Sequence, residues 1–193
     1  MFVAIFGTSA DPPTIAHKTI LNYLGNNYDF VAVYASENPF KSHGSDLPHR
    51  SRMLELLIED MNSTYGNIIH CPEISDRRTI YTVEKAKIKW GENIDLTIVI
   101  GTDLAQQIFT WYEAQQLWQG VKVLLIPREG YKIDNEVITN INHISLGCAI
   151  ANCQTPPFSS TDYRTNHDQG VLTDKVKTYI EENSLYLDEQ KST

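Results

Sequence analysis

Residues 7–17, Gly-Thr-Ser-Ala-Asp-Pro-Pro-Thr-Ile-Ala-His, combine hydroxyl side chains with a histidine directly after a short apolar run. Gly7 permits a sharp exit from a strand, and the two prolines exclude a helix inside the loop. Thr14 can cap the helix that follows, and His17, three residues later, lies on the same helical face. Free amides and the helix dipole favour an anion there, so the segment suits a phosphate. An ordinary cap beside a packed histidine explains the pattern equally well.

A second segment of this kind lies near the other end of the chain, at residues 156–164, Pro-Pro-Phe-Ser-Ser-Thr-Asp-Tyr-Arg. Arg164 falls one turn after Ser160, which again builds a helix start with polar side chains. A guanidinium there can hold two phosphate oxygens at once. Taken alone, a plain serine cap beside a solvated arginine is the simpler interpretation.

A third group of polar and aromatic residues follows the apolar run 96–100. Gly101 and Asp103 come at the end of this run, where a carboxylate is placed to accept hydrogen bonds from ribose hydroxyls. Trp111 and Tyr112 follow, and a tryptophan offers a flat apolar face to a heterocycle. A capping aspartate and a core tryptophan are the alternative interpretation.

Short apolar runs alternate with helical patterns along the chain, and this alternation indicates the fold. We expect strands at 2–6, 30–34, 96–101 and 121–126, and helices at 16–24, 47–61, 83–90, 105–118 and 172–183. Gly25 marks the expected end of the first helix, and 132–152 shows little pattern. The order predicts an α/β fold with a doubly wound, mostly parallel, Rossmann-like sheet. Ligands of such sheets bind beyond the carboxyl ends of the strands, where all three groups fall.

Composition excludes several classes of protein. The chain has 193 residues, of which 41% are hydrophobic, enough for one domain spanning 1–193. Its net charge of −8 argues against a general nucleic-acid binder, which needs clustered Lys and Arg. No apolar run approaches the roughly 20 residues of a membrane span. Three cysteines without Cys-x-x-Cys spacing suggest neither disulfides nor zinc, so we expect a cytoplasmic protein with reduced thiols.

Together the three groups resemble the nucleotidyltransferase superfamily that carries a His/Thr-x-Gly-His signature near the N-terminus and Ser-Ser/Thr-x-x-Arg near the C-terminus. Within it, the chain is similar to bacterial nicotinate-mononucleotide adenylyltransferases over nearly its whole length. The stretches that support this resemblance are 38–41, 49–56, 80–83, 98–103, 110–113, 127–131 and 174–186. The chain departs from the usual pattern at three positions, where Thr8 and Ala16 replace glycines and Ala10 replaces a phenylalanine.

The resemblance implies roles for individual residues. It implies that the C-terminal helical part, about 157–187, completes the ATP phosphate site. The implied catalytic residues are His17, Thr14 and Arg164. The implied ATP-binding residues are Gly7, Thr8, Ser9, His17, Gly101, Asp103, Ser160 and Arg164. The implied pyridine mononucleotide site consists of Lys41, Thr82, Val83, Trp111 and Tyr112.

The reaction implied is attack by the 5′-phosphate of nicotinate mononucleotide on the α-phosphorus of ATP, with release of pyrophosphate. The partners are thus ATP and a pyridine mononucleotide, with no nucleic acid and no membrane. The nucleophile is already an anion, so positioning and charge neutralisation remain for the protein. Mg²⁺ is expected to be held through the ATP phosphates, with no metal site in the protein itself.

Two alternatives stay open. The acceptor could be nicotinamide mononucleotide or phosphopantetheine on the same fold. The chain could instead be a catalytically weak nucleotide-binding homologue, in which Thr8, Ala10 and Ala16 have relaxed the loop. The family contains monomers and assemblies, so a homo-oligomer is left open as well.

Overall fold

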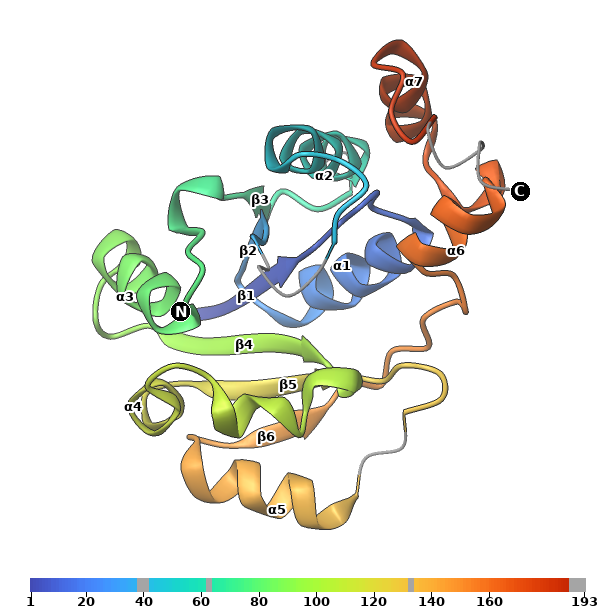
Figure 1. Cartoon of the computed structure of the whole chain (residues 1–193). Helices are drawn as coiled ribbons and strands as arrows, with labels where there is room; N and C mark the ends of the chain where they lie inside the picture. The colour runs from blue at the N-terminus through green and yellow to red at the C-terminus, as the bar shows by residue number, and fades with distance from the viewer. Residues whose placement is uncertain (38–41, 62–63, 132–133, 188–193) are drawn as a thin grey trace.

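The computed structural model describes residues 1–37, 42–61, 64–131 and 134–187, and its centre is a six-stranded parallel sheet (Figure 1). The strand order is β3-β2-β1-β4-β5-β6, and every neighbouring pair is parallel. The strands are β1 (Phe2–Thr8), β2 (Phe30–Ala35), β3 (Ile68–His70), β4 (Asp95–Gly101), β5 (Lys122–Ile126) and β6 (Cys148–Ile150). The order reverses between β1 and β4, which places the ligand-binding crevice of a doubly wound fold between these strands. The predicted fold class is confirmed.

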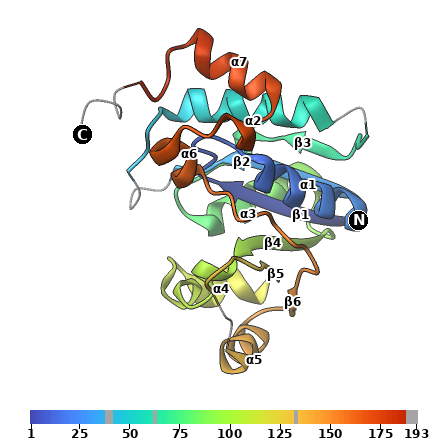
Figure 2. The ribbon, with the colours of Figure 1, turned by 90° about the vertical axis from the view of Figure 1, so that its right-hand side faces the viewer.

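Helices cover both faces of the sheet (Figures 1 and 2). They are α1 (Ile15–Asn27), α2 (Leu47–Met61), α3 (Thr79–Trp90), α4 (Ala114–Gln119), α5 (Asn135–Ile144), α6 (Ser160–Asn166) and α7 (Asp174–Glu182). One buried cluster packs α1, α2, α6 and α7 against the sheet, and a second packs α3, α4 and α5 against the opposite face. No helix in the described ranges is long and apolar enough to cross a membrane.

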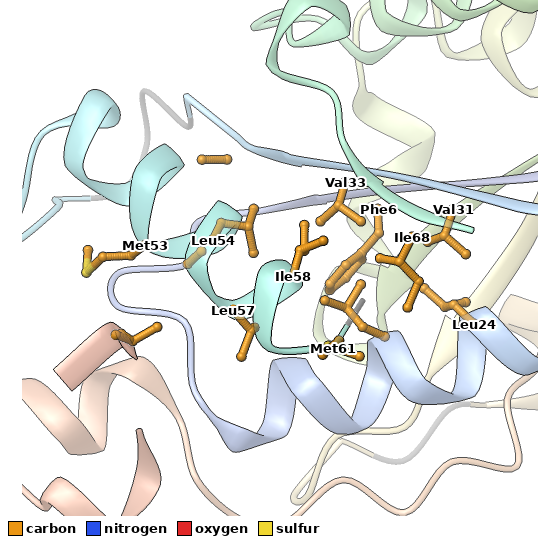
Figure 3. Close-up of a cluster of buried hydrophobic side chains, with 14 of the residues drawn as sticks. Phe6, Leu24, Val31, Val33, Met53, Leu54, Leu57, Ile58, Met61 and Ile68 are labelled. Atoms are coloured by element: carbon orange, nitrogen blue, oxygen red, sulfur yellow. The ribbon is translucent and has the colours of Figure 1, made fainter. Parts of the chain in front are cut away.

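The core between α1, α2 and the sheet follows from two periodicities (Figure 3). Along β2, Val31 and Val33 face this cluster, while Ala32 and Tyr34 face the other, as alternation along a strand requires. On α2, the buried apolar residues recur every three or four positions, which turns one face of the helix onto the sheet. These residues are Met53, Leu54, Leu57, Ile58 and Met61.

Several element boundaries differ from those expected. Helix α1 continues through Gly25 to Asn27, because this glycine serves close packing: a Cβ there would lie 3.0 Å from both Ile68 and Tyr65. The segment 105–118 forms one short 3-10 turn, Gln107–Thr110, and most of the six-residue α4 in place of one helix. Helix α3 begins at Thr79, four residues earlier than predicted. Strand β6 and helix α5 lie in the segment that showed little pattern.

A buried arginine joins the segments that leave the carboxyl ends of β1 and β2. Arg50, on α2, is only 2% exposed. Its Nη1 donates to the carbonyl oxygens of Ser9 (2.7 Å) and Ser36 (2.9 Å), and its Nε donates to the carbonyl oxygen of Ser45 (3.2 Å). Buried carbonyl groups outside regular structure need such donors. Arg50 thus fixes the loops that carry the candidate site.

We expect Arg50→Met to lower the free energy of unfolding by about 2–4 kcal/mol, because three carbonyl groups lose a charged donor. Arg52→Met is the matched control on the same helix. Arg52 is 43% exposed and pairs with Glu55 and Glu59, so its loss should cost less than about 1 kcal/mol. Urea unfolding of both variants measures the difference, and equal losses would contradict the role given to Arg50.

Candidate nucleotide-binding site

The loops that follow β1, β2, β4 and β5 meet at one edge of the sheet, to which all the parallel strands point. Helix α6 lies at this edge beside the start of α1 (Figures 1 and 2). The β1–α1 loop, residues 9–14, crosses the switch point between β1 and β4. Candidate residues from both signature segments form hydrogen bonds with this loop or with the residues next to it.

His17 is held by hydrogen bonds to both of its ring nitrogens. The backbone N–H of Thr14 donates to Nδ1 at 3.1 Å, and the hydroxyl of Thr14 also lies 3.1 Å from Nδ1. An N–H group can only donate, so Nδ1 carries no proton. The proton of the neutral ring therefore sits on Nε2, which donates to the hydroxyl oxygen of Thr8 at 3.0 Å.

The charge state of His17 follows from its surroundings. Burial of the ring, and to a smaller extent the positive charge of Arg128, lower the pKa of His17 to about 4. His17 is therefore a neutral hydrogen-bond donor at physiological pH. A neutral Nε2–H suits a group that stabilises negative charge without exchanging protons.

The second signature segment reaches the same loop. Arg164 donates from Nη1 to the carbonyl oxygen of Asp11 at 2.5 Å, and the hydroxyl of Ser160 donates to the carbonyl oxygen of Pro12 at 2.7 Å. Ser159 caps helix α6 by accepting the N–H of Asp162. Segments about 150 positions apart in the sequence are thus brought together, as the phosphate hypothesis requires.

A further cation lies at the end of β5. Arg128 donates from Nη1 to Oδ2 of Asp103 at 2.7 Å, and its backbone N–H donates to the hydroxyl of Thr102 at 3.0 Å. Asp103 folds back over Gly101, where any Cβ would collide with its carboxylate. Gly101 is therefore required for the position of Asp103. Sequence reasoning assigned no role to Arg128, although a basic residue directly after a strand is a usable signal.

Aromatic residues gather between the start of α3 and the turn before α4. The guanidinium of Arg78 lies 3.7 Å above the ring of Tyr112, and the rings of Tyr81 and Tyr112 are 6.1 Å apart. Trp111 is half-buried and packs against Trp118 at 5.4 Å. Among the described residues, no hydrogen bond occupies the backbone N–H of Tyr112.

Two of the remaining predicted site residues are buried on a helix, one is buried beside His17, and one lies outside the described residues. Thr82 and Val83 are buried on α3, and Thr82 donates its backbone N–H to the carbonyl oxygen of Arg78 through a long contact of 3.4 Å. Thr14 is fully buried, so its side chain serves to orient His17. Lys41 lies outside the described residues.

Several backbone and side-chain positions of residues 7–16, after β1, are fixed by packing or by contacts within the protein. Gly7 is required by packing, because a Cβ there would meet the ring of Tyr34 at 2.5 Å. The carbonyl group of Ser9 is occupied by Arg50. Ala10 is buried with a φ of 46°, a left-handed conformation that favours glycine. Ala16 is half-buried in the first turn of α1.

A cavity of about 390 Å³ opens next to Arg128. Its walls are the segments that follow β5 and β6, formed by Pro127, Arg128, Glu129 and residues 151–155. It therefore lies at the β5–β6 end of the sheet order.

The sequence that carries these loops matches a known family, with residues 5–166 aligned to the model of the cytidylyltransferase-like family. The chain belongs to the cytidylyltransferase-like family. The expected relation to nucleotidyltransferases is therefore confirmed, and it rests on more than the two signature segments.

Individual relatives match nearly the whole chain. A probable nicotinate-nucleotide adenylyltransferase of Synechocystis sp. is 37% identical over 96% of this chain and 99% of the relative. The nicotinate-nucleotide adenylyltransferase of Bacillus subtilis is 23% identical over 95% of this chain and 97% of its own length. The solved structure of Plasmodium falciparum nicotinic acid mononucleotide adenylyltransferase complexed with NaAD has a TM-score of 0.78 at 23% identity, covering 96% and 97% of the two chains. This last likeness shows the shared fold.

We expect the NMR spectrum of His17 to show the proton on Nε2 and no titration between about pH 8 and 5.5, because its pKa is lowered to about 4. The unfolded ring binds a proton below its ordinary pKa of 6.5, whereas the folded ring resists protonation. His17 should therefore stabilise the fold fully above about pH 6.5 and progressively less as the pH falls towards 4. Nitrogen-detected correlation spectra measure the tautomer and the titration, urea unfolding at several pH values measures the stability, and titration of His17 near pH 6.5 would refute the neutral ring.

Proposed function

We propose that this chain transfers the adenylyl group of ATP to nicotinate mononucleotide, giving nicotinate adenine dinucleotide and pyrophosphate, a step of NAD biosynthesis. The observation that carries the proposal is the attachment of His17, Ser160 and Arg164 to the β1–α1 loop and its flanks. These bonds bring donors from both ends of the chain to the loop at the switch point, and a triphosphate needs such donors. The names of the relatives over the full length of the chain supply the acceptor.

The chemistry asks for donors and positioning rather than for a base. The attacking 5′-phosphate is already an anion, so no side chain has to remove a proton. Alignment of two bound reactants supplies roughly 7–11 kcal/mol, and each donor aimed at growing negative charge adds about 3–4 kcal/mol. A neutral His17 with its proton on Nε2 fits the second task, because its donor strength does not depend on pH in the working range.

On the ATP side, Arg164 and Arg128 provide the positive charge. Arg164 uses Nη1 for the carbonyl oxygen of Asp11 and makes a long contact of 3.4 Å from Nη2 to the hydroxyl of Thr161, and we assign its remaining N–H donors to the phosphates. The amides around Gly7, Thr8 and Ser9 and the first turn of α6 at Ser160 add uncharged donors. We assign Asp103 to the ribose hydroxyls, since Arg128 bonds to Oδ2 and Oδ1 can still accept, and we assign the base to the neighbouring cavity of about 390 Å³.

The residues of the site fit a magnesium ion that is carried by the nucleotide. Among the described residues, no group of three His, Cys, Asp or Glu side chains is arranged to hold a metal. The nearest carboxylates are engaged, since Asp11 is buried and Asp103 is paired with Arg128. We therefore assign the coordination of Mg²⁺ to the phosphates and water, where the ion would neutralise charge on the triphosphate.

On the acceptor side, the pyridine ring is assigned to the aromatic group around Trp111. We assign the nicotinate carboxylate to the N–H of Tyr112 and to the neighbouring segment with Thr82 and Val83, where the N–H of Thr82 makes only a long contact of 3.4 Å with the carbonyl oxygen of Arg78. The guanidinium of Arg78 over Tyr112 places a positive charge beside this group, which favours the acid over the amide. The 5′-phosphate is assigned to the segment that contains Lys41.

One observation favours the alternative of a catalytically weak nucleotide-binding homologue. The hydroxyl of Thr8, at a position usually occupied by glycine, already accepts the Nε2–H of His17. This bond has to open or to be shared when the phosphates bind. Binding of an ATP analogue without release of pyrophosphate from ATP and any acceptor would support this alternative.

The proposal is tested by incubating the protein with ATP, Mg²⁺ and one acceptor at a time, and identifying the product by mass spectrometry. Nicotinate mononucleotide, nicotinamide mononucleotide and phosphopantetheine are compared side by side. We expect a dinucleotide and pyrophosphate with the nicotinate form at the highest kcat/KM. A higher kcat/KM with either other acceptor would overturn the assignment.

His17→Ala should lower kcat by about 10²–10³-fold, by analogy with loss of a donor that stabilises transition-state charge. His143→Ala, an exposed histidine on α5, is the control and should match the wild type. A pyrophosphate-coupled assay measures both. An unimpaired His17 variant would remove this residue from the reaction.

Trp111→Ala should raise the KM for the mononucleotide by about tenfold and leave the KM for ATP nearly unchanged, because only the pyridine ring loses a stacking face. Steady-state kinetics with each substrate varied in turn provide the comparison within one variant. An equal rise in both constants would place Trp111 outside the pyridine pocket.

A further inference from the structure

Tyr186, on the segment that follows α7, reaches the β1–α1 loop. The residue is 7% exposed, and its hydroxyl donates to Oδ1 of Asp11 at 2.8 Å. The same hydroxyl lies 2.9 Å from the hydroxyl of Ser45. The ring packs edge-on against Tyr163 of α6, with centroids 5.8 Å apart and planes at 84°. The end of the described chain is thus built into the wall of the candidate site.

Asp11 is the acceptor on which these contacts centre. It is 1% exposed, and its Oδ2 accepts the N–H of Gly44 at 2.7 Å. Its Oδ1 accepts the N–H of Ser45 at 3.1 Å and lies 3.0 Å from the Ser45 hydroxyl, in addition to the bond from Tyr186. A buried carboxylate is tolerated only with such a set of donors, and its orientation is fixed by them.

Arg164 takes its direction from the same residue. Its Nη1 donates to the carbonyl oxygen of Asp11 and lies 3.6 Å from the Oδ2 atom. Gly44 leaves room for the packing around it: a Cβ at Gly44 would lie 2.8 Å from Cδ of Arg164 and 2.9 Å from the ring of Tyr186. The arginine stem and the tyrosine ring therefore pack on the same glycine.

The hydroxyl of Tyr186 remains a donor. Burial and the neighbouring Asp11 carboxylate raise the pKa of Tyr186, and this outweighs the opposing effects of the Ser45 hydroxyl and Arg164. The hydroxyl hence stays protonated at physiological pH and remains available to donate to Asp11.

We propose that Tyr186 is a positioning residue of the ATP phosphate site, acting through Asp11 on the guanidinium of Arg164. The inference rests on the proposed function, because Arg164 is a phosphate ligand only if the chain binds ATP. Without the hydroxyl of Tyr186, Oδ1 of Asp11 loses one of its donors and is held by the contacts with Ser45 alone, so the position of the residue is less tightly fixed. The direction of Arg164 is then less tightly fixed as well, while its charge is kept.

The test compares Tyr186→Phe with Tyr179→Phe. The first substitution keeps the ring packing on Tyr163 and Gly44 and removes only the hydroxyl. Tyr179, on α7, donates or accepts a hydrogen bond with His49 of α2 at 3.0 Å, so its variant loses a bond of the same kind away from the loop. Calorimetry with α,β-methylene-ATP measures affinity, thermal melting follows the fold, and kinetics separate KM from kcat.

We expect Tyr186→Phe to weaken binding of the analogue and raise the KM for ATP by about five- to tenfold, with the KM for the mononucleotide unchanged. Tyr179→Phe should keep wild-type affinity at a comparable melting temperature. Ser45→Ala removes the hydroxyl beside both Tyr186 and Asp11, and should weaken binding in the same direction. If Tyr186→Phe does not fold, the affinity of Ser45→Ala for the analogue tests the inference in its place.

A double-mutant cycle with Arg164→Met decides whether the effect passes through the guanidinium. The double variant should bind the analogue no more weakly than Arg164→Met alone. Additive losses, or wild-type affinity in both Tyr186→Phe and Ser45→Ala, would overturn the inference while the wild type still forms product. A wild type that neither binds the analogue nor forms product would instead refute the proposed function, and the inference with it.

Discussion

Two buried side chains of opposite charge satisfy the polar backbone groups where the central strands end. Arg50 donates to three carbonyl groups, those of Ser9, Ser36 and Ser45. Asp11 accepts the amides of Gly44 and Ser45. Loops cannot satisfy these groups by themselves, because they lack the regular pairing of helices and sheets. The shape of the crevice at the switch point follows from this pair of charges.

Although the chain has a net charge of −8, hydrogen-bond donors gather around the loops that Arg50 and Asp11 fix. His17 contributes a neutral N–H whose direction is set by Thr14 and Thr8. Arg128 and Arg164 are held by hydrogen bonds to acidic residues, one to a carboxylate and one to a carbonyl oxygen. Because each cation is oriented before any ligand arrives, little reorganisation remains for the moment of binding.

The fold and the two signature segments could be predicted from the sequence, because strand alternation, caps and helical spacing are local properties. The edge strand β3 and the pair α5 and β6 escaped prediction because short elements at an edge have little periodicity of their own. Asp11, Arg50 and Tyr186 were missed for a different reason. Their roles arise from contacts between positions up to 175 apart, and no local pattern encodes such contacts. Gly25 was misread because a glycine required for packing resembles a helix stop.

The distribution of the site along the chain bears on how the protein is synthesised. The first loop leaves the ribosome early, whereas Ser160, Arg164 and Tyr186 come from the last quarter of the sequence. The buried carboxylate of Asp11 lacks the hydroxyl of Tyr186 until that last quarter has emerged and docked. Until this last quarter has docked, the β1–α1 loop therefore lacks the contacts of Ser160, Arg164 and Tyr186, and under the proposed function the nascent chain would bind nucleotide less tightly.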